Sequence, residues 1–276
     1  MTARAPVGRA AARLVLVLAV VTAAVVGVTP EVTHRDHPGA RPLVVVALGD
    51  SVPTGFGCDC AGFAQTVADE VGIETGRPSE VANDAVNGAT SGDVVAEVQQ
   101  ESVRSDLARA SLVLLQAGAN DVPLDPSTGQ PCDGGAGCLP GLLAHLRAEL
   151  LATVRVVRAG SHPPVVALLG YWNISVDGTE GRTRGPAFVT NSRAVTGQVN
   201  AVISAVARAT GSVYVDTSTP FLGPDEGRDP TGDLQDDGDH PDASGHRLIA
   251  DAVVAALRSS GALARLRAEL ASGATA

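Results

Sequence analysis

The chain has 276 residues with 30 acidic and 20 basic side chains, and every basic residue is an arginine. Without lysine, the chain cannot form a Schiff base, a phosphate-binding loop of the Gly-Lys-Ser/Thr type or a Ser-Lys dyad. Its formal net charge of −10 argues against binding to nucleic acid, because that function needs a basic surface.

The first thirty residues differ from the rest of the chain. Three arginines precede an uncharged run from Leu14 to Val28. At about 1.5 Å per residue, this run is shorter than the roughly 30 Å hydrocarbon core of a bilayer, which favours a secretory signal over a spanning helix. We therefore predict a signal peptide at 1–27, a linker at 28–41 and a secreted chain without a membrane span after cleavage. An uncleaved membrane anchor is the alternative.

Short apolar runs alternate with longer helical patterns in the remainder. Unalternating runs rich in branched residues are typical of strands buried on both faces of a parallel sheet, and they occupy 43–48, 112–116, 165–169 and 213–215, with a weaker one at 80–82. Amphipathic helical patterns occupy 63–71, 94–107, 139–157, 189–207, 246–257 and the tail from 259. Strands that alternate with helices form βαβ units, so we predict one three-layer α/β domain over residues 42–276.

Three long loops separate these elements, at 121–138, 171–186 and 216–242. Loops of this length in a compact domain usually carry function. Tyr171 and Trp172 open the second loop, where they line the wall of a substrate pocket or form a core aromatic pair. Both interpretations stay open at this point.

The chain has four cysteines, an even number that predicts two disulfides in an oxidising compartment. Of the three pairings that four cysteines allow, we favour Cys132 with Cys138 and Cys58 with Cys60. A zinc site is the alternative, although these spacings differ from the two-residue knuckles of structural zinc sites.

Short polar motifs follow the predicted strands. In doubly wound sheets, ligands bind outside the carboxyl ends of the strands. Four motifs fall at that edge: GDS at 49–51, NG at 87–88, GAND at 118–121 and DGDH at 237–240. Each motif alone is a weak signal, because such residues often serve only turns and helix caps.

Together, the four motifs supply every role that acyl transfer requires. Ser51 is the candidate nucleophile, and His240 is the base that accepts its proton. Asp237, three residues earlier, can orient the imidazole. The backbone N–H groups of Ser51 and Gly88 and the side-chain amide of Asn120 can form an oxyanion hole.

The chain resembles the SGNH (GDSL) hydrolase family over residues 41–257. The family's ordered blocks match Ser51 in GDS, Gly88 in NGATS, Asn120 in GAND and His240 in DGDH, with Asp237 at the D-x-x-H position. The resemblance implies a three-layer α/β/α flavodoxin-like fold with a five-stranded parallel sheet of order 2-1-3-4-5. It also implies an esterase, lipase or related hydrolase with no metal and no cofactor.

Some residues depart from the family pattern or compete for its roles. Residues 52–54, Val-Pro-Thr, follow GDS where the family often has a large apolar residue and a small hydroxyl residue. Asp236, Asp239 and Asp242 are rival partners for the proposed base. His246 is a competing base, although its place at the start of a predicted helix favours a structural role.

The chain does not match two other functional sequence motifs. The chain has no Gly-x-Ser-x-Gly motif, which argues against the α/β-hydrolase arrangement of the same chemistry. A calcium-loop register that begins at Asp233 has Ser244 where the bidentate glutamate belongs.

We therefore predict a secreted, monomeric serine hydrolase that cleaves small-molecule or lipid carboxylic esters through an acyl-serine intermediate. Aromatic residues make up only 3% of the chain, which weakly favours acyl esters over polysaccharide substrates that stack on aromatic rings. A carbohydrate O-deacetylase and a non-catalytic secreted binding protein are the alternatives.

Overall fold

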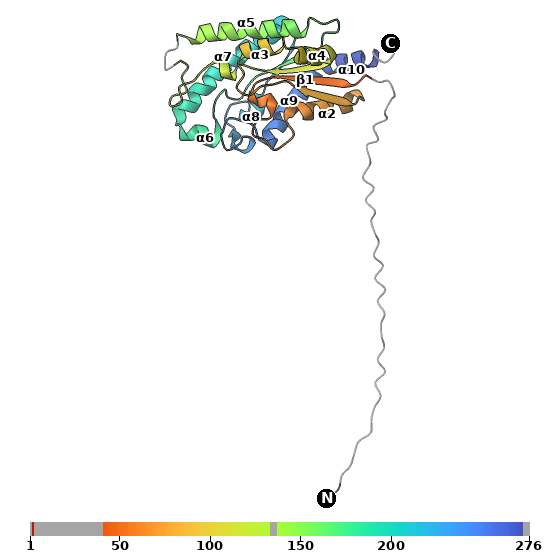
Figure 1. Cartoon of the computed structure of the whole chain (residues 1–276). Helices are drawn as coiled ribbons and strands as arrows, with labels where there is room; N and C mark the ends of the chain where they lie inside the picture. The colour runs from red at the N-terminus through yellow and green to blue at the C-terminus, as the bar shows by residue number, and fades with distance from the viewer. Residues whose placement is uncertain (1, 3–40, 133–136, 273–276) are drawn as a thin grey trace. The chain divides into compact units, whose positions relative to one another are not determined.

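The computed structural model describes residues 2, 41–132 and 137–272, and it is built around a parallel β-sheet (Figure 1). Its strands are β1 (Leu43–Gly49), β2 (Ser79–Asn83), β3 (Leu112–Gln116), β4 (Val165–Leu169) and β5 (Val213–Val215). They lie in the order β2-β1-β3-β4-β5, and every neighbouring pair is parallel. The predicted sheet and its order are confirmed.

The edge strand β2 differs from the central strands in burial. Every residue of β1, β3 and β4 is buried, as their unbroken apolar runs predict. β2 instead mixes half-buried and exposed residues, because β1 is its only neighbour in the sheet. This position explains why the run at 80–82 gives the weakest strand signal.

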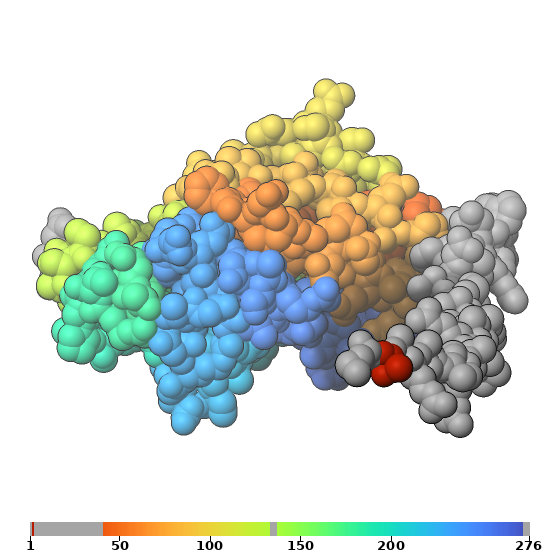
Figure 2. Space-filling model, turned by 90° about the horizontal axis from the view of Figure 1, so that it is seen from below, coloured from red at the N-terminus to blue at the C-terminus, as the bar shows by residue number. Residues whose placement is uncertain are grey.

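Helices cover both faces of the sheet (Figure 1). One face carries α2 (Phe63–Thr75), α9 (Ala243–Ser259) and α10 (Ala262–Ser272), and α2 and α9 lie side by side on it (Figure 2). The other face carries α3 (Ser91–Glu97), α4 (Glu101–Arg109), α5 (Leu139–Val157) and α7 (Pro186–Thr210). This is the three-layer α/β/α arrangement that the alternation of elements predicts.

The stretch 94–107 forms two helices, α3 and α4, so the single helix that its pattern predicts is wrong. Val94 and Val98 are buried four residues apart. Val103 and Leu107 repeat that spacing in α4, nine positions later in the chain. In a continuous helix, this nine-residue offset would place the second pair about 180° from the first around the axis. The extended N-cap of α4 (ψ 144°) breaks the helix and lets both pairs reach the core.

Two of the predicted long loops contain short helices. The loop at 171–186 contains α6 (Gly178–Thr183), and the loop at 216–242 contains α8 (Ser218–Leu222) and the 3₁₀ helix η2 (Pro230–Asp233). The last loop also closes on itself at its carboxyl end, where Leu234 bridges to Pro241. The proposed catalytic acid and base therefore lie in a short, tied segment.

The predicted signal peptide at 1–27 and linker at 28–41 lie outside the described residues, apart from Thr2 and Arg41. The described residues from Arg41 onward belong to one compact unit. Within these ranges, no helix combines the length and the apolar character that a membrane crossing requires.

Candidate active site

The nucleophile candidate lies on a turn that only glycine permits. Gly49 ends β1 with a φ of 131° and pairs in register with Gln116. A Cβ at position 49 would overlap the carbonyl oxygen of Gln116, so no other residue fits. Asp50 then caps the short helix α1 (Ser51–Thr54) by accepting a hydrogen bond from Val52 N at 3.1 Å. Ser51 is thereby presented at the carboxyl edge of the sheet.

The unusual proline after GDS is compatible with this turn. Pro53 is the third residue of α1 and is buried. The first N–H groups of a helix have no intrahelical acceptor, so a proline there loses no hydrogen bond. The departure from the family pattern leaves the position of Ser51 unaffected.

Ser51, His240 and Asp237 form one hydrogen-bonded line. His240 Nε2 lies 2.9 Å from Ser51 Oγ, and His240 Nδ1 lies 2.7 Å from Asp237 Oδ2. The other carboxylate oxygen of Asp237 accepts the backbone N–H groups of Asp239 at 2.9 Å and His240 at 3.0 Å. The loop therefore holds the carboxylate in place with its own backbone.

The environment of Asp237 favours its ionised form. Partial burial raises the pKa of Asp237, but the hydrogen bonds from His240 and Asp239 outweigh it, so its pKa lies below the ordinary value. A carboxylate that stays ionised can fix the Nδ1–H tautomer of His240 and stabilise the imidazolium.

The geometry favours Asp237 over the rival acids. Within the described part of the chain, Asp237 supplies the only carboxylate that is hydrogen-bonded to the His240 ring. Asp242 caps α9 by accepting Gly245 N at 2.9 Å. Burial raises the pKa of Asp239, so this group is less suited to supply a negative charge.

The second motif forms a tight turn beside β1. Val86 N donates to Gly49 O at 2.9 Å, and Ala89 N donates to Val86 O at 3.1 Å. Gly88 is exposed in this turn with a φ of 75°, a conformation that other residues rarely adopt. Its N–H is thus carried by a backbone anchored directly to the nucleophile turn.

Two side-chain hydrogen bonds join the three segments that carry the oxyanion candidates. The Thr54 hydroxyl, one helical turn after Ser51, lies 2.6 Å from Asn87 Oδ1. Asn120, in the 3₁₀ helix η1 (Ala119–Asp121), donates from Nδ2 to Ala89 O at 3.0 Å. Because a side-chain amide carries two N–H groups, Asn120 has a second one to offer a ligand. As the first residue of α1, Ser51 likewise has an N–H without an intrahelical acceptor.

The competing base His246 is a core side chain. It is 1% exposed, and its Nδ1 accepts a hydrogen bond from Phe63 N at 3.3 Å. Burial lowers its pKa to about 4, which keeps the ring neutral. His246 contacts α2 and not the nucleophile.

Tyr171 and Trp172 do not form a pocket wall. Both are 1% exposed, and Trp172 stacks on Phe221 with ring centroids 4.1 Å apart. The structure therefore contradicts the pocket interpretation and agrees with the core aromatic pair. The residues directly after a buried strand continue into the core here before the chain reaches the surface.

The Tyr171 hydroxyl instead reveals a contact that the sequence did not predict. It donates to Asp50 Oδ2 at 2.5 Å, directly before the candidate nucleophile Ser51. Burial raises the pKa of Asp50 to about 7, while the hydrogen bonds from Tyr171 and Val52 act to lower it. The only sequence signal for this pair is that both residues follow strands of one sheet.

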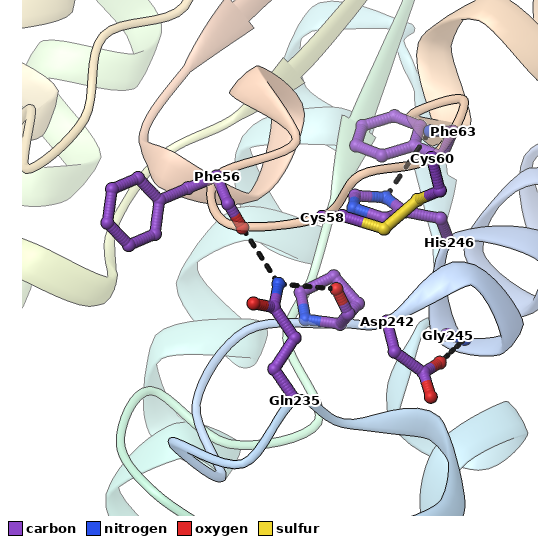
Figure 3. Close-up of a disulfide and its surroundings, with 9 residues drawn as sticks. Phe56, Cys58, Cys60, Phe63, Gln235, Asp242, Gly245 and His246 are labelled. Atoms are coloured by element: carbon purple, nitrogen blue, oxygen red, sulfur yellow. Dashed lines mark hydrogen bonds between the residues drawn. A yellow bond between two sulfur atoms is a disulfide. The ribbon is translucent and has the colours of Figure 1, made fainter.

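Both favoured disulfides are present in the structure. Cys58 is bonded to Cys60, and Cys132 is bonded to Cys138. The Cys58–Cys60 bond lies beside His246 (Figure 3) and forms with it the group of potential metal ligands found among the described residues. Because metals bind thiolates and not disulfide sulfur, this arrangement does not fit the zinc alternative.

Comparisons with known proteins identify a family for this chain. The model of the GDSL-like lipase/acylhydrolase family matches residues 47–248. No curated protein matches the chain.

Solved structures with the same fold include a lipase, Lip_vut3, from a goat rumen metagenome. It is 16% identical with a TM-score of 0.62, and the match covers 78% of this chain and 97% of the lipase. A lipase/acylhydrolase from Enterococcus faecalis is 18% identical with a TM-score of 0.55, covering 79% and 96%. The acetylxylan esterase Axe2 from Geobacillus stearothermophilus is 22% identical with a TM-score of 0.53, covering 80% and 96%.

Proposed function

Because the chain belongs to the GDSL-like lipase/acylhydrolase family, we propose that it cleaves carboxylic esters through an acyl-serine intermediate on Ser51. Membership places the chain among carboxylic ester hydrolases. The observation that carries the mechanism is the line of two hydrogen bonds, 2.9 Å and 2.7 Å long, from Ser51 through His240 to Asp237.

In the acylation step, Ser51 Oγ attacks the ester carbonyl carbon while His240 Nε2 takes the hydroxyl proton. The carbonyl oxygen becomes an oxyanion, which accepts hydrogen bonds from Ser51 N, Gly88 N and Asn120 Nδ2. The bond from the carbonyl carbon to the alcohol oxygen then breaks. His240 returns its proton to that oxygen, and the alcohol leaves.

In the deacylation step, water replaces the alcohol. His240 Nε2 takes a proton from water as the water oxygen attacks the acyl carbon, and the same donors hold the second oxyanion. The bond to Ser51 Oγ breaks, and Ser51 regains the proton from His240. The product is the carboxylic acid, so His240 acts in both steps.

The variant Ser51→Ala tests the assignment of the nucleophile. We expect it to abolish release of nitrophenol from a short acyl ester and to lose labelling by a fluorophosphonate. Ser105→Ala, on the exposed face of α4, is the matched control and should retain both. Activity retained in Ser51→Ala would refute the proposal, and an inert Ser51 in folded wild-type protein would favour the non-catalytic binding protein.

The variant Asn120→Ala tests the oxyanion hole. Loss of one donor should lower kcat by about 10² to 10³, or about 3 kcal/mol. An unchanged kcat would remove Asn120 from the mechanism.

We also propose that the protein is secreted and acts as a monomer on small-molecule or lipid esters. The support for secretion is the charged and apolar pattern of residues 1–27. N-terminal sequencing of the exported chain should find a new terminus near residue 28, whereas an intact terminus would favour a membrane anchor. A series of esters of increasing acyl length, set beside an acetylated sugar, separates the lipase and O-deacetylase alternatives.

A further inference from the structure

We propose that Phe56 recognises the alcohol portion of the ester by presenting an apolar face beside His240. This inference rests on the proposed function, because it concerns the substrate of the same site. It assigns a substrate contact to a residue outside the motifs that carry the chemistry.

Phe56 is exposed although it is large and apolar. Among the described residues, the exposed large hydrophobic side chains are Phe56 at 46%, Ile73 at 67% and Val86 at 48%. Single exposed apolar residues are ordinary, so exposure alone assigns no role. Phe56 differs from Ile73 in its neighbour: its ring centroid lies 4.8 Å from that of His240.

The backbone of Phe56 is fixed on two sides. Its N–H donates to Ser51 O at 3.2 Å, which ties it to the nucleophile helix. Its carbonyl accepts Gln235 Nε2 at 2.8 Å, and the same nitrogen donates to Pro241 O at 3.0 Å, beside His240. The loop thus bridges the nucleophile and the base.

The ring points away from the packed side of this loop. Figure 3 shows the Phe56 ring directed away from the Cys58–Cys60 bond, while His246 and Phe63 lie on the side of that bond. The disulfide follows Phe56 by two residues and restrains the chain that carries it. A ring held this way is preorganised, so a ligand that contacts it pays little for ordering it.

The direction of proton transfer decides which part of the ester meets this ring. The alcohol oxygen must accept the proton from His240 Nε2, so it lies within hydrogen-bond reach of the imidazole when the bond breaks. The acyl carbon is then attached to Ser51 Oγ. Phe56 packs against the imidazole, and its exposed face therefore borders the alcohol.

The groups around the Phe56 ring favour an alcohol with an apolar surface. Gln235, which bonds the Phe56 carbonyl, donates from its side-chain nitrogen to two backbone carbonyls and has no N–H left for the substrate. The recognised feature is thus an apolar face, which an alkyl or aryl alcohol offers and which the C–H face of a sugar ring also offers. The two sources share this contact, and the substrates below separate them.

The test varies the alcohol while the acyl group stays acetate. For Phe56→Ala, we expect kcat/KM relative to that for methyl acetate, the alcohol ratio, to fall about tenfold on hexyl and benzyl acetate or on an acetylated pyranoside. A fall confined to an acetylated pyranoside would identify a sugar as the source, and a fall confined to hexyl and benzyl acetate would identify an alkyl or aryl alcohol. No change in the kcat/KM of the pyranoside, hexyl acetate or benzyl acetate relative to methyl acetate, which includes equal losses on all of them, would overturn the inference.

A matched control separates the effect of an exposed apolar side chain from the effect of its position beside His240. Ile73 lies near the carboxyl end of α2, which runs back from the catalytic edge to the opposite edge of the sheet. Ile73→Ala removes an exposed apolar side chain there, and it should leave the alcohol ratio unchanged. A ratio altered equally in both variants would show that general surface hydrophobicity, not Phe56, governs the preference.

Deacylation separates recognition from positioning of His240. The alcohol has left before water attacks, so Phe56→Ala should change the deacylation rate constant of the acetyl-enzyme less than twofold while acylation by hexyl acetate slows. Equal slowing of both steps would show that Phe56 only holds the imidazole, which would also overturn the inference. Ser51→Ala reports separately on the proposed function: if that variant is inert and the alcohol ratio of Phe56→Ala is unchanged, only the role of Phe56 fails.

Discussion

Asp237 and Asp50 both lie next to the proposed catalytic residues, yet their surroundings are opposite. The Asp237 side chain is 43% exposed, and N–H donors hold its pKa below the ordinary value. Asp50 is 1% exposed, and burial raises its pKa to about 7. The first contacts the imidazole of His240, whereas the second contacts the Tyr171 hydroxyl.

The difference shows that the solvent and the donors around a carboxyl group decide its role. Asp237 is suited to remain charged opposite a developing imidazolium. Asp50 works through hydrogen bonds, because its two oxygens accept Val52 N and the Tyr171 hydroxyl. We therefore expect the charge of Asp237 to affect activity. At Asp50, we expect the shape of the side chain and its hydrogen bonds to affect stability.

The largest effect is expected for Asp237→Asn. This variant keeps the shape of the side chain but removes its charge and disturbs the tautomer of His240, so kcat on a short acyl ester should fall by about 10³ to 10⁴. Asp236→Asn, at an exposed neighbouring position, is the control and should retain activity. A loss of less than tenfold in Asp237→Asn would show that the charge of Asp237 is not required.

The next effect concerns pH and stability at Asp50. A carboxyl group whose pKa rises on folding binds its proton more tightly in the native state than in the unfolded chain. Its contribution to the free energy of unfolding is therefore complete below pH 3.8 and is lost as the pH rises to about 7. For a shift of this size, the free energy of unfolding of the wild type, relative to Asp50→Asn, should fall by up to about 4 kcal/mol between pH 4 and pH 8.

Urea denaturation of both chains across this pH range measures that difference. The contributions of other titrating groups, including the neutral His246, cancel because both chains contain them. If the free energies of unfolding of the wild type and Asp50→Asn change in parallel with pH, Asp50 titrates in the folded protein as it does in the unfolded chain.

The smallest effect is expected for Tyr171→Phe. The ring stays in the core, but Asp50 Oδ2 loses its donor, which should lower the free energy of unfolding by about 1–3 kcal/mol at neutral pH. The lost hydrogen bond also acts to lower the pKa of Asp50, so the pH dependence should move to higher pH. Tyr214→Phe, on β5, is a control that leaves Asp50 untouched, and an equal pH shift in both variants would contradict this account.

Elements with a strong local pattern were predictable from the sequence. The apolar stripe of 139–157 predicts α5 with its observed bounds, and the runs at 112–116 and 165–169 predict β3 and β4. The break between α3 and α4 was missed because no glycine or proline marks it. It arises because the buried Val103 follows the buried Val98 by five positions, a spacing that matters only once both helices pack on the sheet.

The site was predictable where spacing carries the information. Asp237 and His240 are three residues apart on one loop, so their contact is local. The pair of Asp50 and Tyr171 was not predictable, because 121 residues separate them and only the sheet brings them together. Phe56 was missed for the same reason, since its role follows from the loop that carries His240.

The contact between Ser51 and His240 joins residues that are 189 positions apart. In the proposed mechanism, a chain that has not yet closed this contact has a serine without a base, so hydrolysis would begin only when nearly the whole domain is assembled. Contacts this distant in sequence form slowly compared with local ones. Recovery of esterase activity during refolding should therefore lag behind the recovery of helical signal, which makes the enzyme a reporter of its own final folding step.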